Sequence, residues 1–405
     1  MENKNRIGRR EFMATSAGAL AAGLGSACGR VPRGEIEEAA AKVGRLPRRP
    51  LDRSGRKVSV LIGAADWAPE AVEAGLLCGI NYWHKSQKWA AGGAPQAILK
   101  NREAYYCEIC VDRVRGNHET GVIEEEPDYQ FVKQAVERTG LRYFDDMVLH
   151  FGYHNLAEHK ENRDFIRAYE RLKKEGLVRH MALSQHSYNG NIKVPGGEDR
   201  VSILTAVLDE GLYEHAQFAF TFGEGEALTK FVSQAKSKGF GTTAMKTAAG
   251  TVRMQADREF MSTFPPETTP HHALARWLTT RTDLSTAVIQ INSLEEFVDT
   301  YSGAGKPLRA ADARAIEMMT AYANREVCRL CNDCMSHCAE GVPIAEILRY
   351  ERYATDCGER ERARKLYAQL AKRADACQAC GSCLPHCPQG LEIPTKLAAA
   401  HRLLS

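Results

Sequence analysis

The stretch YFDDMVLH (Tyr143–His150) is a mostly apolar run that opens with two aromatic residues, contains Asp145 and Asp146, and ends on a histidine. A short run of this kind between polar segments is typical of a strand buried in a parallel sheet. On either side, Pro127–Arg138 and Asn162–Glu175 have the apolar spacing of helices. The segment therefore predicts one buried strand flanked by two helices.

Further strand candidates of this kind alternate with helical patterns such as Leu228–Ser237. The eight candidates are Val58–Ile62, Gly79–Trp83, Ala104–Cys110, Tyr143–His150, Arg179–Ser184, His215–Phe220, Gly239–Lys246 and Thr286–Ile291. Eight strand–helix units in about 250 residues predict an α/β fold, the (β/α)8 TIM barrel, whose active sites lie at the C-terminal strand ends. The candidate site residues there are His84, Cys110, His150, Ser184, Gln185, Gln217 and Lys246.

Eight of the thirteen cysteines form two copies of one spacing near the end of the chain. The copies are Cys328, Cys331, Cys334 and Cys338, then Cys377, Cys380, Cys383 and Cys387. Both read C-x2-C-x2-C-x3-C, the run that holds 4Fe–4S clusters on thiolates in bacterial ferredoxins. We therefore predict two 4Fe–4S clusters as cofactors, with one-electron transfer as their chemistry.

In two-cluster ferredoxins the fourth cysteine of each run ligates the other cluster. That pattern predicts one cluster on Cys328, Cys331, Cys334 and Cys387, and a second on Cys377, Cys380, Cys383 and Cys338. Zinc, usually held by two separated C-x2-C pairs, and a disulfide framework, typical of short secreted chains, are the alternatives. Because the segment between the runs has helical spacing, we predict a small all-helical, two-cluster ferredoxin-like domain over residues 313–405.

The first thirty residues predict where the protein acts. Arg9, Arg10 and Phe12 precede a mildly apolar stretch, which resembles a twin-arginine export signal over residues 1–30. The segment from Leu24 to Cys28 also fits a lipoprotein cleavage site with Cys28 acylated. We expect an exported chain, periplasmic or otherwise extracytoplasmic, with membrane contact through a lipidated Cys28. A disordered basic tail is the alternative.

The composition of the chain predicts the bounds of the barrel and bears on nucleic-acid and membrane binding. Residues 31–56 are rich in arginine, glycine, proline and alanine and predict a linker, which leaves residues 57–312 for the barrel. With 54 basic and 51 acidic residues the formal net charge is +3, which gives no support for nucleic-acid binding. Past the signal, no apolar run is long enough to cross a membrane.

Several segments of the expected barrel resemble the aldo/keto reductase family, in the family's own order. GINYW (Gly79–Trp83) looks like the family's second strand, and Tyr143–His150 looks like the fourth, which ends in the active-site histidine. Leu172–Ser184 resembles the fifth unit, Gln217 fits the sixth strand, and Ala244–Lys246 fits the seventh. This resemblance implies a TIM barrel. One subgroup of the family carries a C-terminal 4Fe–4S ferredoxin domain and a twin-arginine signal, and this chain resembles that subgroup at both its N-terminal and its C-terminal end.

The catalytic tetrad of that family is altered in this chain. In the family, tyrosine is the general acid, and its pKa is lowered by a lysine that pairs with an aspartate. Here His84 and Trp89 stand at the aspartate and tyrosine positions, Cys110 stands at the lysine position, and only His150 remains. We predict His150, polarising a substrate carbonyl, and His84, donating the proton, as the catalytic residues. An offset alignment would use Lys85 or Lys88 and Tyr82 or Tyr106 instead.

The resemblance also implies a nicotinamide cofactor, NADP(H) or NAD(H). Ser184 and Gln185 resemble the pair that holds the nicotinamide amide, Gln217 has the matching role, and Lys246 ends the seventh strand. These four are the predicted cofactor-binding residues. The segment Gln290–Glu296 lacks the basic residue that clamps a 2′-phosphate.

The histidines at the strand ends allow a different site. His84, His150 and His186, with Cys110 between them, could bind zinc or iron. Histidines that hydrogen-bond loop backbone are the alternative.

Two functions follow from these patterns. In the first, the chain is an exported iron–sulfur oxidoreductase that acts on a small carbonyl or alcohol substrate. Its electrons come from or go to a redox protein or a membrane electron carrier. In the second, the barrel has lost catalysis and serves as a docking module, while the clusters relay electrons between partners.

Overall fold

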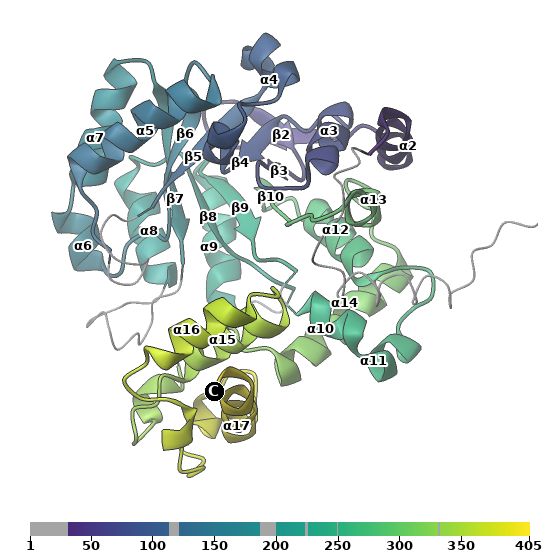
Figure 1. The fold of residues 1–405 in the computed structure, drawn as a ribbon, viewed down its shortest axis with the longest axis vertical. Helices are drawn as coiled ribbons and strands as arrows, with labels where there is room; N and C mark the ends of the chain where they lie inside the picture. The colour runs from purple at the N-terminus through teal and green to yellow at the C-terminus, as the bar shows by residue number, and fades with distance from the viewer. Residues whose placement is uncertain (1–30, 113–120, 187–199, 223–225, 249, 331–332) are drawn as a thin grey trace, which may run out of the picture.

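The computed structural model describes residues 31–112, 121–186, 200–222, 226–248, 250–330 and 333–405. The predicted export signal with Cys28, and the cluster ligand Cys331, lie outside the described residues. Within them, a barrel of strands and helices is followed by a small helical domain (Figure 1). No helix of the described residues is long and apolar enough to span a membrane.

The eight strands form a parallel sheet in chain order. They are β3 (Gly63–Ala64), β4 (Tyr82–His84), β5 (Tyr106–Val111), β6 (Phe144–Leu149), β7 (Val178–Gln185), β8 (His215–Ala219), β9 (Gly241–Met245) and β10 (Thr286–Ala287). The sheet closes where Ile62, just before β3, pairs with Val288, just after β10; the Ile62 N–H donates to the Ala287 carbonyl at 2.9 Å. The predicted TIM barrel is confirmed, with strand bounds shifted by a few residues.

Amphipathic helices cover the outside of the barrel. They include α3 (Pro69–Leu77), α5 (Glu125–Thr139), α7 (Asp164–Lys174), α8 (Arg200–Glu210), α9 (Glu226–Ser237), α12 (Pro270–Thr280) and α13 (Leu294–Tyr301). Helix α5 shows why the sequence folds this way: its first turn carries three acidic residues, which the helix dipole favours, and it ends at Gly140 with φ 73°. Its buried face includes Tyr129, Val132 and Ala135. Fully burying such an apolar side chain contributes about 2 kcal/mol.

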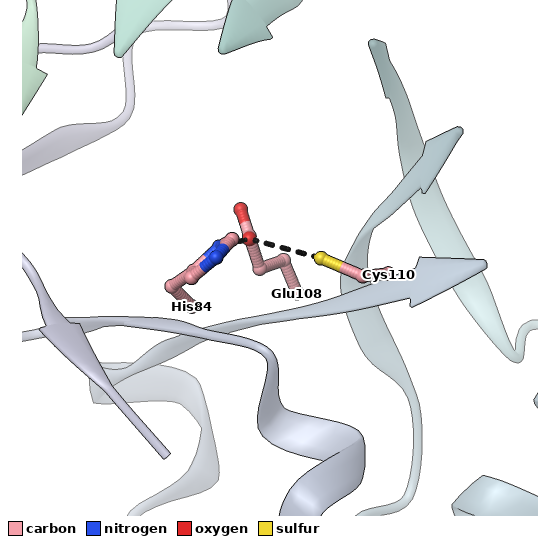
Figure 2. Close-up of side chains that lie close together, drawn as sticks. All are labelled: His84, Glu108 and Cys110. Carbon is pink, nitrogen blue, oxygen red and sulfur yellow. Dashed lines mark hydrogen bonds and ion pairs between the residues drawn. The ribbon is translucent and has the colours of Figure 1, made fainter. Parts of the chain in front are cut away.

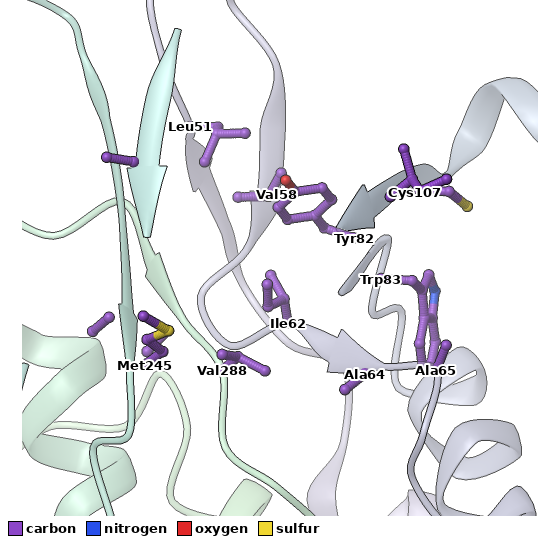
Figure 3. Close-up of a cluster of buried hydrophobic side chains, with 14 of the residues drawn as sticks. Leu51, Val58, Ile62, Ala64, Ala65, Tyr82, Trp83, Cys107, Met245 and Val288 are labelled. Atoms are coloured by element: carbon purple, nitrogen blue, oxygen red, sulfur yellow. The ribbon is translucent and has the colours of Figure 1, made fainter. Parts of the chain in front are cut away.

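A core of aromatic and aliphatic side chains packs around the strands of the barrel (Figure 3). Trp83 lies in it, edge-to-face with Trp67 at 6.0 Å between ring centroids. Gly63 makes this packing possible, because a Cβ at that position would stand 2.4 Å from the Trp83 ring. Any side chain at residue 63 would therefore displace the indole.

The prediction of a linker over residues 31–56 is wrong. Helix α2 (Arg33–Val43) buries Ile36, Ala40 and Val43 against the barrel. Strand β1 (Arg48–Pro50) then pairs antiparallel with β2 (Lys57–Ser59). The composition of this segment hid the helical spacing of its few apolar residues, which is what decides burial. Of the first predicted strand, Val58–Ile62, only Val58 and Ser59 lie in β2, and the barrel strand β3 begins one residue after the predicted range.

The boundary at residue 312 is also too early. Helix α14 (Ala310–Glu326) packs on the barrel helix α12. Its Ala315, Ile316 and Met319 share a cluster with Met254 and Phe264 of the barrel. Because this helix buries its apolar face on the barrel, the second domain begins only after Glu326.

The second domain consists of helices over the described residues from 327 to 405. They are the 3-10 helices η3 (Met335–His337), η4 (Ala374–Ala376) and η5 (Leu384–His386), and the α-helices α15 (Ile344–Thr355), α16 (Arg360–Ala368) and α17 (Ile393–Leu404). They enclose a core of their own that includes Ile344, Ile347, Tyr367 and Leu397. In Figure 1 these yellow helices lie at one end of the barrel, next to α10 (Thr251–Ala256) and α14.

Candidate functional site

A buried carboxylate, Glu108, lies at the centre of the barrel interior. It is on β5, two residues before Cys110, so both side chains point inward, whereas Cys107 packs in the outer core. The Tyr82 hydroxyl donates to Glu108 at 2.7 Å, and the Gln217 amide also donates to it. His84 Nδ1 contacts the other carboxylate oxygen (Figure 2). Glu108 is thus held by side chains from β4 and β8.

These contacts set the protonation of the interior groups. Burial pushes the pKa of Glu108 upward, but the His84 charge and hydrogen bond, with Gln217 and His215, outweigh it, so this pKa lies below its usual value. Burial and the charges of Asp146 and Glu108 raise the pKa of Tyr82 well above 10. Tyr82 is therefore a neutral hydrogen-bond donor and lacks the lowered pKa of a general acid.

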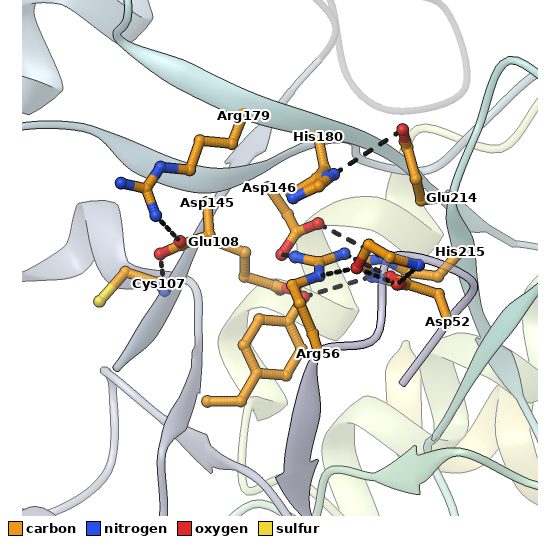
Figure 4. A network of polar contacts seen from close by, with 12 residues as sticks. Asp52, Arg56, Cys107, Glu108, Asp145, Asp146, Arg179, His180, Glu214 and His215 are labelled. Atoms are coloured by element: carbon orange, nitrogen blue, oxygen red, sulfur yellow. Dashed lines mark hydrogen bonds and ion pairs between the residues drawn. The ribbon is translucent and has the colours of Figure 1, made fainter. Parts of the chain in front are cut away.

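The interior network continues toward the β1–β2 hairpin. His215 Nε2 lies 3.3 Å from the Tyr82 hydroxyl, and its Nδ1 lies 3.6 Å from Asp146. Arg56 donates to Asp146 at 2.7 Å and also binds Asp52 (Figure 4). A continuous row of polar side chains therefore runs through the barrel from the hairpin to His84.

A pocket lies between the C-terminal ends of β7 to β9 and the second domain. It is lined by Phe151, His186, Arg200, Ala219, Thr221, Phe222, Met245, Lys246, Ala323, Asn324, Val327, Cys328, Arg329, Leu330, Arg349, Arg352, Tyr353 and Gln389. Its wall is partly apolar, and Cys328, a predicted cluster ligand, belongs to it. The pocket therefore joins the barrel mouth to the cysteine-rich domain.

Arg253 on α10 holds the two sides of this pocket together. It donates to Asp356, Glu351 and Thr355, the first two at or near the end of α15, each at 2.6 Å. Two of these are charge-assisted bonds, which are stronger than neutral ones. The position of α15 over the barrel mouth thus depends on one barrel arginine.

Lys246 is the central cation of the pocket. It follows β9 in a left-handed conformation, φ 55°, and its Nζ lies 3.0 Å from His186 Nδ1. The side chain is open to the solvent of the pocket, yet protein atoms surround it. This burial, with the nearby charges of Arg349, Arg352 and Arg200, lowers the pKa of Lys246 to about 7. Lys246 can therefore release or accept a proton near neutral pH.

His150 stands beside the same pocket, at the end of β6. Its Nδ1 contacts Asp112, and its ring lies 4.2 Å from Phe151 and 5.5 Å from His186 between centroids. Burial lowers the pKa of His150 below its usual value, although Asp112 opposes that shift. His150, His186 and Lys246 form one group of titratable side chains around Phe151.

Four of the predicted cluster ligands line a second, smaller cavity. They are Cys338, Cys377, Cys380 and Cys383, the set that the crosswise pattern assigns to one cluster. Four thiols facing a common space are the donor set that a 4Fe–4S cluster needs. For the other set, Cys328, Cys334 and Cys387 are in the described part of the chain.

The two cysteine runs have matching backbones. In both runs the residue before the second cysteine has a left-handed backbone conformation: Leu330 at φ 60° and Ala379 at φ 52°. The Val342 N–H donates to Cys338 Sγ at 3.3 Å, and the Leu391 N–H donates to Cys387 Sγ at 3.4 Å. Backbone donors of this kind stabilise thiolate sulfur. The residues present therefore fit the implied clusters.

The predicted nicotinamide residues have other partners. Gln185 accepts from the Tyr153 N–H at 3.1 Å and donates to the carbonyls of Tyr153 and His186, both at 2.9 Å. Gln217 donates to Glu108, and Ser184 is buried with its hydroxyl 3.8 Å from the Met245 sulfur. Only Lys246 of the four faces the pocket. The Gln217 Oε1 has no hydrogen-bond partner among the described residues, but Gln217 is buried and, like Ser184 and Gln185, does not line the pocket.

The structure divides the histidines that could form a metal site. Ligand atoms of His84, Glu108 and Cys110 lie within 4.8 Å of one another. His150 and His186 belong to the group around Phe151 instead. Trp89, at the position of the family's tyrosine, packs on Trp83 in the core.

Sequence reasoning missed Glu108. The signal was its position two residues before Cys110 on an otherwise apolar strand, which places a carboxylate on the inward face. A charged residue there requires partners inside the barrel.

Comparison with known proteins gives matches only among solved structures. No family model matches the chain, and no curated protein does. The aldo-keto reductase AKR11C1 from Bacillus halodurans, holo form, is 16% identical, with a TM-score of 0.49 over 67% of this chain and 96% of that one. A protein described as an aldo-keto reductase from Pseudomonas aeruginosa is 14% identical, with a TM-score of 0.46 over 68% of this chain and 97% of that one. Likenesses at this level do not bear on function, which has to be argued from the residues.

Proposed function

We propose that the protein is an iron–sulfur oxidoreductase whose substrate binds in the pocket between the barrel mouth and the second domain. One observation carries the proposal: Cys328, a predicted cluster ligand, lines the same pocket as Lys246. A small molecule beside Lys246 would then lie close to a cluster. Short distances of this kind favour electron transfer without a further carrier.

The cysteines hold the redox groups. Two 4Fe–4S clusters, when bound, supply one-electron transfer. Cys338, Cys377, Cys380 and Cys383 hold one of them, and the other four cysteines of the two runs hold the second. Interconversion of a carbonyl and an alcohol moves two electrons and two protons, so two clusters match the electron count. A redox protein or membrane electron carrier exchanges these electrons with the outside.

The protons are handled at the barrel mouth. Lys246, with its pKa lowered to about 7, exchanges the proton on the substrate oxygen, and His186 holds the Lys246 amine in position. The second proton, which bonds to the substrate carbon, is exchanged with water in the pocket. His150 lies next to this pair and polarises the carbonyl. His84 is bonded to Glu108 inside the barrel, which makes Lys246 the better-placed proton donor.

We also propose that the protein is exported. Arg9 and Arg10 support a twin-arginine route, which carries proteins already folded around cofactors. The clusters would then work outside the cytoplasm. Acylation of Cys28 would keep them near a membrane carrier.

One observation supports the alternative function, in which the barrel has lost catalysis and only docks a partner. Gln185 donates to backbone carbonyls and Gln217 donates to Glu108, so the amide N–H groups of two residues that match the family's nucleotide site are not offered to a ligand. If the barrel only docks a partner, the clusters should take electrons from that partner and from no small molecule.

Purification of the full chain without oxygen tests the proposal. Iron and sulfide should each amount to about eight per chain, and dithionite should bleach the visible absorbance. Cys383→Ser should remove about half of the iron, whereas Cys357→Ser, at an exposed cysteine outside both runs, should leave it unchanged. Zinc in place of iron, or equal iron in both variants, would contradict the cluster assignment.

Nucleotide addition to the same sample separates the two functions. NADPH and then NADH are added while binding and cluster absorbance are recorded together. Because the predicted nicotinamide residues face other partners, we expect neither nucleotide to bleach the clusters. Bleaching would show a nicotinamide-linked reductase and would mean that the protein binds the nucleotide despite the protein contacts of Gln185 and Gln217.

A further inference from the structure

We propose that the pocket between the barrel and the second domain binds a small organic polyanion, one with at least two carboxylate or phosphate groups on a short carbon skeleton. This inference deepens the proposed function and rests on it, since it names the substrate class of the same pocket. Its binding step can be tested apart from electron transfer.

The charges of the pocket wall are one-sided. Five cationic side chains line it, and no carboxylate does so among the described residues: the cations are Arg200, Lys246, Arg329, Arg349 and Arg352. They come from the barrel, from the chain that links the domains, and from α15. Like charges held together in a partly enclosed space repel one another, and a bound anion removes that cost.

The carboxylates that pair with two of these cations do not themselves line the pocket. Glu346 pairs with Arg349 at 3.2 Å. Asp356 lies 3.7 Å from Arg352 and also accepts from Arg253, which binds Glu351 as well.

The other two arginines have neutral acceptors among their partners. Arg200 donates to the Ala219 carbonyl at 3.2 Å, and Arg329 donates to the Asn324 amide oxygen at 3.0 Å. Both side chains also line the pocket. Five cations therefore face the cavity, with no carboxylate among its described lining residues, and more than one anionic group of a ligand can meet them.

The rest of the lining favours an organic anion over a simple inorganic one. Phe151, Phe222, Met245, Leu330 and Tyr353 give the pocket an apolar wall opposite the cations. Binding sites for organic ligands combine such a wall with a few charged groups that fix orientation. Inorganic phosphate could use the cations but would leave the apolar surface in contact with water.

Lys246 gives independent support. The neighbouring Arg349, Arg352 and Arg200 lower its pKa to about 7 after the larger effect of burial, which shows that its surroundings disfavour further positive charge. An anion beside Lys246 would reverse that preference and stabilise the ammonium form.

Calorimetric titration of the full chain, with clusters intact and without oxygen, tests the inference. The probes are tricarballylate, which has three carboxylates and no iron-chelating hydroxyl, then butyrate with one carboxylate, then inorganic phosphate. Tricarballylate should bind at least about tenfold more tightly than either of the others, which corresponds to about 1.4 kcal/mol. Equal affinities for all three, or no binding, would overturn the inference.

Two variants locate the binding. Lys246→Met and Arg200→Gln should each weaken tricarballylate binding by about tenfold or more. Lys236→Met, on the exposed surface of α9, is the matched control and should bind as the parent does. If the control variant lost binding, or if the two pocket variants bound as tightly as the parent, the anion would have to bind elsewhere. Tight binding by a protein whose clusters resist dithionite would leave this inference standing and remove the electron-transfer function.

Discussion

The barrel interior and the pocket at its mouth both concentrate charged side chains, but they treat them in opposite ways. Inside the barrel, Glu108 and Asp146 each face cationic or hydrogen-bonding partners from neighbouring strands and from Arg56. At the mouth, five cations line a pocket without a carboxylate among its described lining residues. The charged groups of the interior contact one another, whereas those at the mouth face a cavity that a ligand can enter.

This difference separates groups that hold the structure from groups that act on a substrate. A buried charge whose partners are all protein atoms stabilises one arrangement and is costly to break. Charges that line a cavity open to solvent can also contact a ligand. The comparison predicts large stability effects from the interior and large binding effects from the pocket.

The largest expected effect comes from the interior. Glu108→Gln removes the buried charge that His84, Tyr82 and Gln217 surround. We expect a loss of about 3 kcal/mol in the free energy of unfolding, measured by urea denaturation. The exposed Glu317→Gln on α14 should change it by less than about 0.5 kcal/mol. Equal effects of both variants would mean that Glu108 is not the centre of the interior network.

A smaller effect is expected at the junction of the two regions. Arg253→Gln breaks the bonds to Asp356 and Glu351 that position α15 over the barrel mouth. This should weaken the docking of the second domain by about 2 kcal/mol and speed hydrogen exchange in α15. Arg258→Gln, exposed on the neighbouring α11 (Arg258–Thr263), is the control. Unchanged exchange in α15 would show that other contacts hold the domain.

The smallest effect is a pH dependence of anion binding. In the free protein Lys246 loses its proton as the pH rises through about 7, and a bound anion favours the protonated form. Tricarballylate affinity should therefore be highest below about pH 7 and fall above it, by at most about tenfold per pH unit.

Other charged groups lie near Lys246, so a control variant is needed to show that Lys246 itself titrates. His186, Arg200, Arg349, Arg352 and Lys85 surround it. Lys246→Met should leave the affinity nearly flat between about pH 7 and pH 9, where carboxylates stay ionised. If the full slope persisted in that variant, His186 would be the titrating group.

The sequence predicts what depends on local pattern. Strand–helix alternation predicted the barrel, because short, mostly apolar strand runs such as Phe144–Leu149 recur between segments with helical spacing. The cysteine spacing predicted a set of four thiols that line one cavity in the structure. Both patterns concern residues whose partners lie at fixed spacings along the chain.

What the sequence did not predict depends on contacts between distant segments. Helix α2 was predicted to be part of a linker because its segment is rich in arginine, glycine, proline and alanine, whereas the burial of its apolar residues depends on α3 and α13. Gln185 was expected to face a cofactor, but the loop after β6 takes up its amide. The cationic pocket joins Lys246 to arginines about one hundred residues later, and no local pattern links them.

Electron paramagnetic resonance of the dithionite-reduced protein, with and without tricarballylate, tests the central claim most directly. The claim is that the anion pocket adjoins the cluster held by Cys328. It predicts signals from two reduced clusters, of which one shifts on addition of tricarballylate in the parent and in Lys236→Met but not in Lys246→Met. Absence of cluster signals, or tricarballylate binding that leaves both signals unchanged, would contradict it.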